Sequence, residues 1–293
     1  MKNDLGFRAL IPVTAGWSGD SKYCAAGSDG KRYFLRVAPP EKAERAKKSF
    51  ELQKKMYYLG VPMCEPLECG ECEEGFYTLQ SWVDGVNAED AVPPMPEADQ
   101  YELGCEAGAI LKKIHSIPAP ENAPGWEPRF NAKMDRKIKN YIECPIKVEG
   151  AECFIEYIER SRDLLRGRPQ CFQHGDYHIG NMMIDESGAL RIIDFDRCDF
   201  GDPWEEFRRI VWCAQASPPF ASGMADGYFD GDVPPDFWRL LALYIGSNTL
   251  ASLPWAIPFG EEEVQTMLRQ AKDVLRWYDG FTTVIPSWYI DRK

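Results

Sequence analysis

Three side chains with oxygen donors lie close together in the middle of this 293-residue sequence. They are Asp176 in a His-Gly-Asp run, Asn181 after four intervening residues, and Asp194 thirteen positions beyond Asn181. Carboxylate and amide oxygens are the ligands that Mg²⁺ takes from proteins, and a carboxylate can also accept a proton from a reacting hydroxyl. Residues of these types in this order therefore favour metal-assisted chemistry with a general base.

The segment from Cys171 to Glu206 holds these residues in the runs HGDYHIGN and IDFD. This order resembles the catalytic core of kinase-like phosphotransferases, with HGD in place of HRD and IDFD in place of DFG. Within that group it resembles the aminoglycoside phosphotransferase family, which also covers choline, homoserine and fructosamine kinases. The resemblance implies an α+β, protein-kinase-like fold with two lobes. We expect a small antiparallel β-rich nucleotide-binding lobe at 1–82 and a larger, mainly helical lobe at 83–293.

The resemblance gives each of these residues a role. Asp176 is the candidate base, and Asn181 and Asp194 are the candidate Mg²⁺ ligands. The apolar run 190–193 predicts a short buried strand that ends at Asp194, and 182–184 is its expected hairpin partner, so the two ligands should lie at neighbouring strand ends. Asp196 is either a further metal contact or a turn residue, and the nearby histidines, His174 and His178, are expected to order the loop.

The N-terminal residues carry the signals of a small sheet. An Asp-Gly turn at 27–30 separates two strand-like runs, 22–26 and 32–37, and such a pattern predicts a hairpin. The preceding Gly-Trp-Ser-Gly-Asp loop, which contains Ser18, would lie over the nucleotide phosphates. Arg36 occupies the place where the family has a phosphate-binding lysine. Arginine keeps the charge and can bind two phosphate oxygens, although the two side chains are not interchangeable.

Two further elements of the lobe follow from the resemblance. Residues 41–59 are rich in Glu, Lys and Ala and predict a helix with an apolar stripe. In the family a glutamate on this helix pairs with the cation of the third strand, and Glu51 is the first candidate here, with Glu44 second. Residues 77–85 resemble the hinge between the lobes, where backbone groups of Ser81 and Val83 would bind the nucleobase.

Composition limits the partners of the chain. Lys and Arg number 34 against 46 Asp and Glu, a formal charge of −12, which disfavours nucleic acid and suits a cationic small molecule. We expect no membrane span, because no run of eighteen apolar residues occurs, and no signal-peptide core at the N-terminus. Ten cysteines without a secretory signal are typical of reduced thiols, so a cytoplasmic location is expected.

The acceptor is expected to be a small, cationic molecule. By resemblance an aminoglycoside is the leading candidate, phosphorylated by ATP or GTP with Mg²⁺, and Glu205 and Glu206 are candidate contacts for its ammonium groups. Asp202, just before them, is expected to support the loop from a helix N-cap. Choline or another amino alcohol is the alternative of the same class, and a neutral acceptor such as a macrolide is also open. A nucleotide-binding regulator without catalysis is the alternative of a different class.

Overall fold

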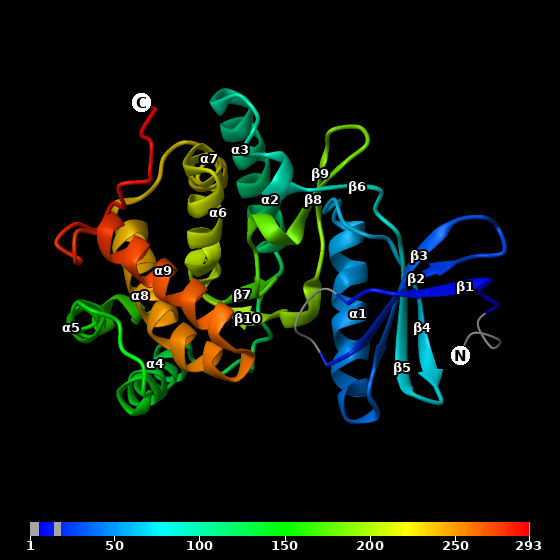
Figure 1. Ribbon diagram of the computed structural model, residues 1–293, viewed down its shortest axis with the longest axis horizontal. Coiled ribbons are helices and arrows are strands. Elements are labelled where there is room, and N and C mark those ends of the chain that lie inside the picture. The colour runs from blue at the N-terminus through cyan, green and yellow to red at the C-terminus, as the bar shows by residue number, and fades with distance from the viewer. Residues whose placement is uncertain (1–5, 15–18, 293) are drawn as a thin grey trace. The chain divides into compact units, whose positions relative to one another are not determined.

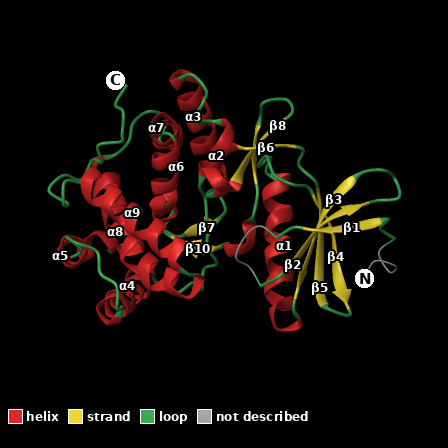
Figure 2. Ribbon diagram, viewed as in Figure 1, coloured by secondary structure: helices red, strands yellow, loops and turns green. Residues whose placement is uncertain are grey.

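The computed structural model describes residues 6–14 and 19–292, and these form two compact units. The first unit contains the chain up to Ala91 together with Asn181–Cys198. The second contains Val92–Gly180 and the chain from Asp199 onward. The first unit is mostly sheet and the second mostly helix (Figures 1 and 2). The division differs from the expected boundary at residue 82. Residues 83–91 belong to the first unit, and so does Asn181–Cys198, which comes much later in the sequence.

A five-stranded antiparallel sheet forms the first unit's main layer. The strand order is β1-β2-β3-β5-β4. The predicted hairpin is confirmed: β2 pairs with β3 so that Lys22 lies opposite Arg36, and Gly30 in the turn has a φ of 81°. A positive φ suits glycine, which has no Cβ. The strands are β1 Ala9–Pro12, β2 Ser21–Ala26, β3 Arg32–Ala38, β4 Pro66–Cys72 and β5 Gly75–Ser81.

One helix, α1 (Ala43–Tyr58), packs against β4 and β5. It follows the 3₁₀ turn Pro40–Lys42. Phe50 and Met56 of the predicted apolar stripe are buried, whereas Leu59, at the end of the helix, is 47% exposed. The stripe prediction is therefore right within the helix and wrong at its end.

A second, three-stranded sheet explains why residues 181–198 belong to the first unit. Its strands, in the order β6-β8-β9, are β6 Gly85–Asn87, β8 Met182–Asp185 and β9 Leu190–Ile192, and α2 (Ala88–Ala91) follows β6. The predicted β8–β9 hairpin is confirmed. Asp185 closes its turn by accepting hydrogen bonds from the amides of Ser187 and Ala189. The amide of Ile192 also donates to the carbonyl of Pro62 at 2.8 Å.

Helices make up most of the second unit, with one short antiparallel pair, β7 and β10, among them. The strands are Cys171–Gln173 and Asp199–Gly201. The helices are α3 Glu97–Ile114, α4 Trp126–Glu143, α5 Glu152–Ser161, α6 Ile210–Ala216, α7 Pro218–Tyr228, α8 Pro235–Ala256 and α9 Glu261–Trp277.

The helix α8 is strongly apolar. By length and composition alone, the stretch Pro235–Phe259 could cross a membrane, but 67% of its apolar window is buried inside the structure. Burial of this kind is typical of a core helix, whose apolar surface is covered by neighbouring helices.

The helices α3 and α7 lie side by side (Figure 1), and glycines bring their backbones into contact. A Cβ atom on Gly104 would overlap the carbonyl oxygen of Phe220, and one on Gly223 would overlap that of Tyr101. Backbone atoms cannot move aside as the end of a side chain can. The four glycines of this contact are Gly104, Gly108, Gly223 and Gly227.

We expect Gly223→Ala to lower the free energy of unfolding by about 1–3 kcal/mol, the usual cost of overpacking a well-packed core. Gly246→Ala in α8 is the matched control, because its Cβ would meet only ring atoms of Phe281 and Phe154, at 3.4 and 3.6 Å. Urea denaturation of both variants measures the difference. Equal stability of the two variants would contradict the account of the α3–α7 contact.

Candidate active site

The His-Gly-Asp loop follows β7 in the second unit and is fixed by short-range bonds. The amide of Asp176 donates to Nδ1 of buried His174 at 3.2 Å. Gly175 has a φ of 88°, and its amide donates to both carboxylate oxygens of Glu206 at 3.0 Å. His178 repeats the first pattern, because its Nδ1 accepts from the amide of Gly180 at 3.2 Å. Both histidines therefore order the loop, as expected.

The carboxylate of Asp176 is largely buried but retains 16% exposure. Its Oδ1 lies 2.9 Å from Nε of Arg209 and 3.9 Å from Nε2 of His178. Arg209 thus orients the carboxylate. Sequence reasoning missed Arg209, although it stands three residues after Glu206 on the same 3₁₀ helix, Glu205–Arg209.

Glu205 and Glu206 are buried and have partners inside the protein. Glu205 contacts Arg208 at 2.5 Å and Lys133 at 3.2 Å. Burial would raise the pKa of Glu205, but the charges of Arg208 and Lys133 outweigh it and lower the pKa to about 2. The prediction that these carboxylates are available to an ammonium group is not supported.

Glu206 binds the loop rather than facing solvent. Besides the amide of Gly175, its Oε2 lies 3.9 Å from Nε2 of His115. Burial opposes its ionisation, yet the nearby imidazole of His115 and the charge of Arg208 lower the pKa of Glu206. An ionised carboxylate that accepts the hydrogen bond of the Gly175 amide therefore supports the His-Gly-Asp loop.

Asp202 supports the loop as predicted, although the N-cap of the Glu205–Arg209 helix is Trp204 and not Asp202. It is fully buried, and its carboxylate accepts hydrogen bonds from Nε and Nη2 of Arg168 at 2.6 and 2.9 Å. The hydroxyl of Tyr244 donates to it at 2.6 Å, and the amide of Trp204 at 2.9 Å. A carboxylate with this many donors fixes the start of the Glu205–Arg209 helix.

In the first unit, the candidate metal ligands lie at neighbouring strand ends, as expected. Asn181 immediately precedes β8, and Asp194 follows β9. The amide of Ile193 donates to the carbonyl of Asn181 at 3.0 Å and joins the two segments. Asp194 has φ 61° and ψ 61°, a left-handed conformation that is uncommon outside glycine and occurs at functional positions.

These donors fit Mg²⁺. The Asp194 side chain is 46% exposed and its nearest cation, Nη1 of Arg36, is 3.5 Å away, so carboxylate oxygens remain available. The described residues contain no group of three His, Cys, Asp or Glu side chains that could hold a metal. Mg²⁺ usually takes one or two protein oxygens and completes its shell with phosphates and water, so a pair of oxygen donors is sufficient for it.

Arg36 on β3 contacts three carboxylates. Its Nε lies 2.7 Å from Asp20, its Nη2 lies 2.7 Å from Asp196, and its Nη1 faces Asp194. Asp196 therefore binds the strand-three cation. The part of the chain that the structure describes has no ion pair between Arg36 and Glu51, which we expected from the helix.

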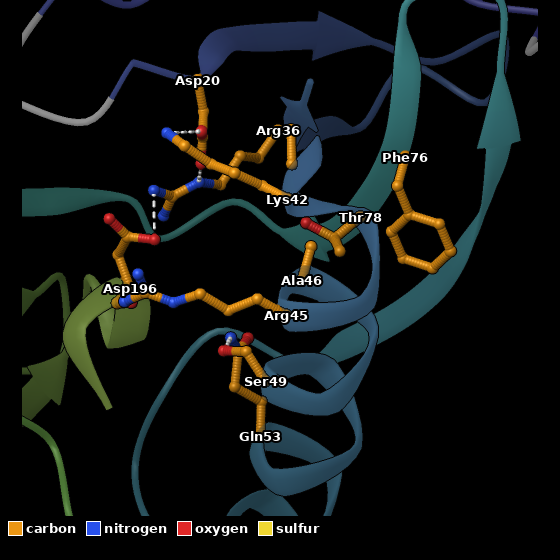
Figure 3. Close-up of a pocket in the computed structure, with 11 residues that line it drawn as sticks. Asp20, Arg36, Lys42, Arg45, Ala46, Ser49, Gln53, Phe76, Thr78 and Asp196 are labelled. Carbon is orange, nitrogen blue, oxygen red and sulfur yellow. Dashed lines mark hydrogen bonds and ion pairs between the residues drawn. The ribbon is translucent and has the colours of Figure 1, made fainter. Parts of the chain in front are cut away.

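Helix geometry explains why Glu51 does not reach Arg36. The face of α1 that lines the pocket carries Arg45, Ser49 and Gln53, four residues apart (Figure 3). Glu51 is two residues from Ser49 and so points to the opposite side, where it is exposed and contacts Lys54 at 3.1 Å.

Asp20 supplies the carboxylate that was expected from the helix. It also contacts Lys42 at 3.1 Å, and its side chain is 6% exposed (Figure 3). Burial would raise the pKa of Asp20, but hydrogen bonds and charges of Arg36 and Lys42 lower it. Sequence reasoning noticed the loop that ends at Asp20 but not this role.

We expect Asp20→Asn to reduce the free energy of unfolding by about 1–3 kcal/mol, because a largely buried guanidinium loses a charged partner. Glu51→Gln is the matched control, and it should change stability by less than about 0.5 kcal/mol, since Glu51 is exposed. Chemical denaturation distinguishes the two. A larger loss for Glu51→Gln would restore the helix residue as the partner of Arg36.

Of the remaining predicted nucleotide contacts, Ser81 has a backbone hydrogen bond that bears on the prediction. Ser18 lies outside the described residues. The amide of Ser81 donates to the carbonyl of Glu65 at 2.9 Å, so this N–H already has a partner within the first unit. Val83, in the segment from β5 to β6, stays a predicted nucleobase contact.

The comparison with protein families agrees with this geometry. The profile of the phosphotransferase enzyme family (APH) matches residues 9–241, which include Arg36, Asp176, Asn181 and Asp194. The chain belongs to this family. A phosphotransferase of this kind is expected to bind a nucleotide, and the oxygen donors described above suit the metal that accompanies it.

Solved structures of aminoglycoside phosphotransferases share the fold of this phosphotransferase. APH(4)-Ia, as a thermostable mutant in complex with ADP and hygromycin B, is 17% identical, with a TM-score of 0.65 and coverage of 94% of this chain and 96% of that one. The GDP complex of an aminoglycoside 2′-phosphotransferase-IIIa mutant is 11% identical, with a TM-score of 0.68 and coverage of 96% and 95%. These likenesses confirm the α+β, kinase-like fold.

Two curated mammalian proteins match part of this phosphotransferase. Acyl-CoA dehydrogenase family member 11 of Mus musculus is 20% identical over 221 residues, and that of Rattus norvegicus is 21% identical over 224. The matches cover 69% of this chain but only 28% of each relative.

Proposed function

We propose that this phosphotransferase transfers the γ-phosphoryl group of ATP or GTP to a hydroxyl group of a small molecule, with Mg²⁺. One observation carries the proposal: Asn181 and Asp194 present oxygen donors from adjoining strand ends, joined by the Ile193 amide. Family membership and a His-Gly-Asp loop that is fixed by hydrogen bonds support it.

The protein's residues divide the chemistry. Mg²⁺, held by Asn181 and Asp194, would neutralise charge on the phosphates. Asp176, oriented by Arg209, accepts the proton of the acceptor hydroxyl. The hydroxyl oxygen then bonds to the γ-phosphorus, the bond from that phosphorus to the β-phosphate oxygen breaks, and the nucleoside diphosphate leaves with the electron pair.

Arg36 has a positioning role in this proposal. Its three nitrogens already face carboxylates, including that of Asp194. It therefore orients Asp194 and Asp196, and a nucleotide phosphate must replace one of these contacts before Arg36 can bind it. Binding of a nucleotide phosphate by Arg36 thus remains part of the proposal, although each guanidinium nitrogen of Arg36 already faces a carboxylate that competes with the phosphate.

The acceptor class has separate support. Solved relatives are described with hygromycin B and gentamicin, so an aminoglycoside-like, cationic acceptor follows from likeness, with choline-type amino alcohols as the alternative. Against this, Glu205 and Glu206 are bound within the protein. The cations around Asp176 favour an anionic acceptor instead.

The test is phosphoryl transfer from labelled ATP and GTP, with and without Mg²⁺, to aminoglycosides, amino alcohols, neutral alcohols and hydroxy acids. We expect acceptor-stimulated, Mg²⁺-dependent release of diphosphate. Nucleotide binding without transfer to any acceptor would refute the proposal and favour a nucleotide-binding regulator.

A further inference from the structure

Four cations lie near one another within the second unit, and two of them contact the His-Gly-Asp loop: Arg208 donates to the carbonyl of Gly175 at 2.8 Å, and Arg209 contacts Asp176. We call them the basic cluster, and its members are Lys133, Lys137, Arg208 and Arg209. The two lysines are one turn apart on α4 and both lie over the ring of Phe130, with Nζ 5.3 and 6.0 Å from its centroid. Such cation–π contacts hold an ammonium group without neutralising it.

The carboxylates near the basic cluster are already paired. Glu205 contacts Lys133 and Arg208, and Asp176 contacts Arg209. Lys137 instead donates to the neutral hydroxyl of Ser247 on α8, at 3.3 Å. Within the described chain, no carboxylate forms an ion pair with Lys137.

The environment of Lys137 disfavours the charged form of its side chain. Burial lowers the pKa of Lys137 well below its ordinary value, and the charges of Lys133, Arg208 and Arg209 lower it further. Glu205 is the group that opposes them. An anion placed beside Lys137 would offset both burial and repulsion.

We propose that the acceptor carries an oxyanion, a carboxylate or a phosphate monoester, that binds Lys137 and Lys133 while its hydroxyl faces Asp176. This inference rests on the proposed phosphoryl transfer and names the substrate class for the same site. An ammonium-bearing acceptor would meet the like charges of the basic cluster and find Glu205 and Glu206 already paired.

The experiment compares acceptors that differ in one charge. Hydroxy acids of increasing chain length are assayed beside their methyl esters and the amino alcohols of equal length, with glycerol phosphate as the phosphate arm. Wild-type protein and Lys137→Met are used with MgATP for transfer and with MgADP for calorimetric binding. For at least one acceptor with an oxyanion, we expect kcat/KM to be at least tenfold higher than for its methyl ester and for the amino alcohol of equal length. We expect Lys137→Met to remove that preference.

Two further variants separate charge from folding. Lys137→Arg should retain most of the preference, because it keeps the cation. Lys139→Met, on the same helix, should leave it unchanged, because the Lys139 side chain is 72% exposed and contacts only Glu143 among the ion pairs described.

Proton uptake gives a readout that a purely structural role would not change. An anion raises the pKa of a neighbouring lysine. Binding of the oxyanion should therefore take up protons, seen as a heat that depends on the buffer. Lys133, Glu205, Arg208 and Arg209 also face Lys137, so the uptake is assigned to Lys137 only if Lys137→Met abolishes it.

Each outcome decides between the two proposals. Preference for an ester, an amino alcohol or an aminoglycoside would overturn the inference and leave phosphoryl transfer intact. An equal loss of kcat/KM for all acceptors in Lys137→Met would also overturn the inference, because the basic cluster would then act on the transferred phosphate and not on the acceptor. Oxyanion binding that depends on Lys137, without transfer to any acceptor, would refute the proposed function and leave the anion site. No oxyanion binding above that of the esters would overturn the inference.

Discussion

Asp176→Asn should lower kcat by about 10²–10⁴-fold, the usual contribution of a positioned general base. The amide has the shape of the carboxylate, and the loop keeps its backbone bonds to His174 and Glu206, so it should stay in place. The affinity for MgATP should change little, because Asp176 is not among the proposed metal ligands. Single-turnover transfer and equilibrium nucleotide binding measure the two effects separately.

Asp163→Asn is the control for that experiment. Its side chain is 88% exposed and pairs only locally, with Arg166 three residues on. Full turnover is expected in this variant. If Asp176→Asn keeps more than a tenth of wild-type turnover, Asp176 is not the base.

Asp194→Asn should raise the Mg²⁺ concentration needed for half-maximal ATP binding by at least about 10–100-fold, the loss that removal of even an outer-shell partner typically causes. Asparagine is the appropriate substitution, because Asp194 has a φ of 61° and asparagine tolerates the left-handed region better than alanine. The measurement is nucleotide binding at increasing Mg²⁺, which does not depend on turnover.

A second left-handed aspartate provides the control. Asp230 has a φ of 55° and a side chain that is 78% exposed. Asp230→Asn makes the same chemical change on a similar backbone, and it should leave the Mg²⁺ requirement unchanged. Equal requirements in wild type and Asp194→Asn would remove Asp194 from the metal site.

Local signals in the sequence were sufficient for the parts of the fold built by neighbouring residues. The Asp-Gly turn predicted the β2–β3 hairpin, and the turn at 185–188 predicted β8–β9. The neighbouring positions of Asn181 and Asp194 followed from that second hairpin. In each case the partners are close in sequence, so turn chemistry alone sets the register.

Contacts between distant residues were harder to predict. Any acidic residue of α1 could have paired with Arg36, and the choice between Glu51 and Asp20 depended on how the helix is rotated against the sheet. Charge alone also misled at Glu205 and Glu206, because their contacts with Lys133 on α4 and with His115 just after α3 come from distant parts of the chain. The environment of Lys137 arises in the same way, from the packing of α4 against α8.

The pairing of β6 with β8 has a consequence for biosynthesis. Gly85 lies opposite Asp185, one hundred residues later, so the sheet that carries Asn181 and Asp194 at its strand ends closes only after α3, α4 and α5 have been made. At a synthesis rate of about 5–20 residues per second, β6 leaves the ribosome roughly 5–20 s before its partner. During that interval the nascent chain holds Arg36 and Asp20 without Asp194 or Asp196. The first unit therefore cannot mature as an independent N-terminal domain, and any ligand that needs Asp194 can stabilise the chain only late in its synthesis.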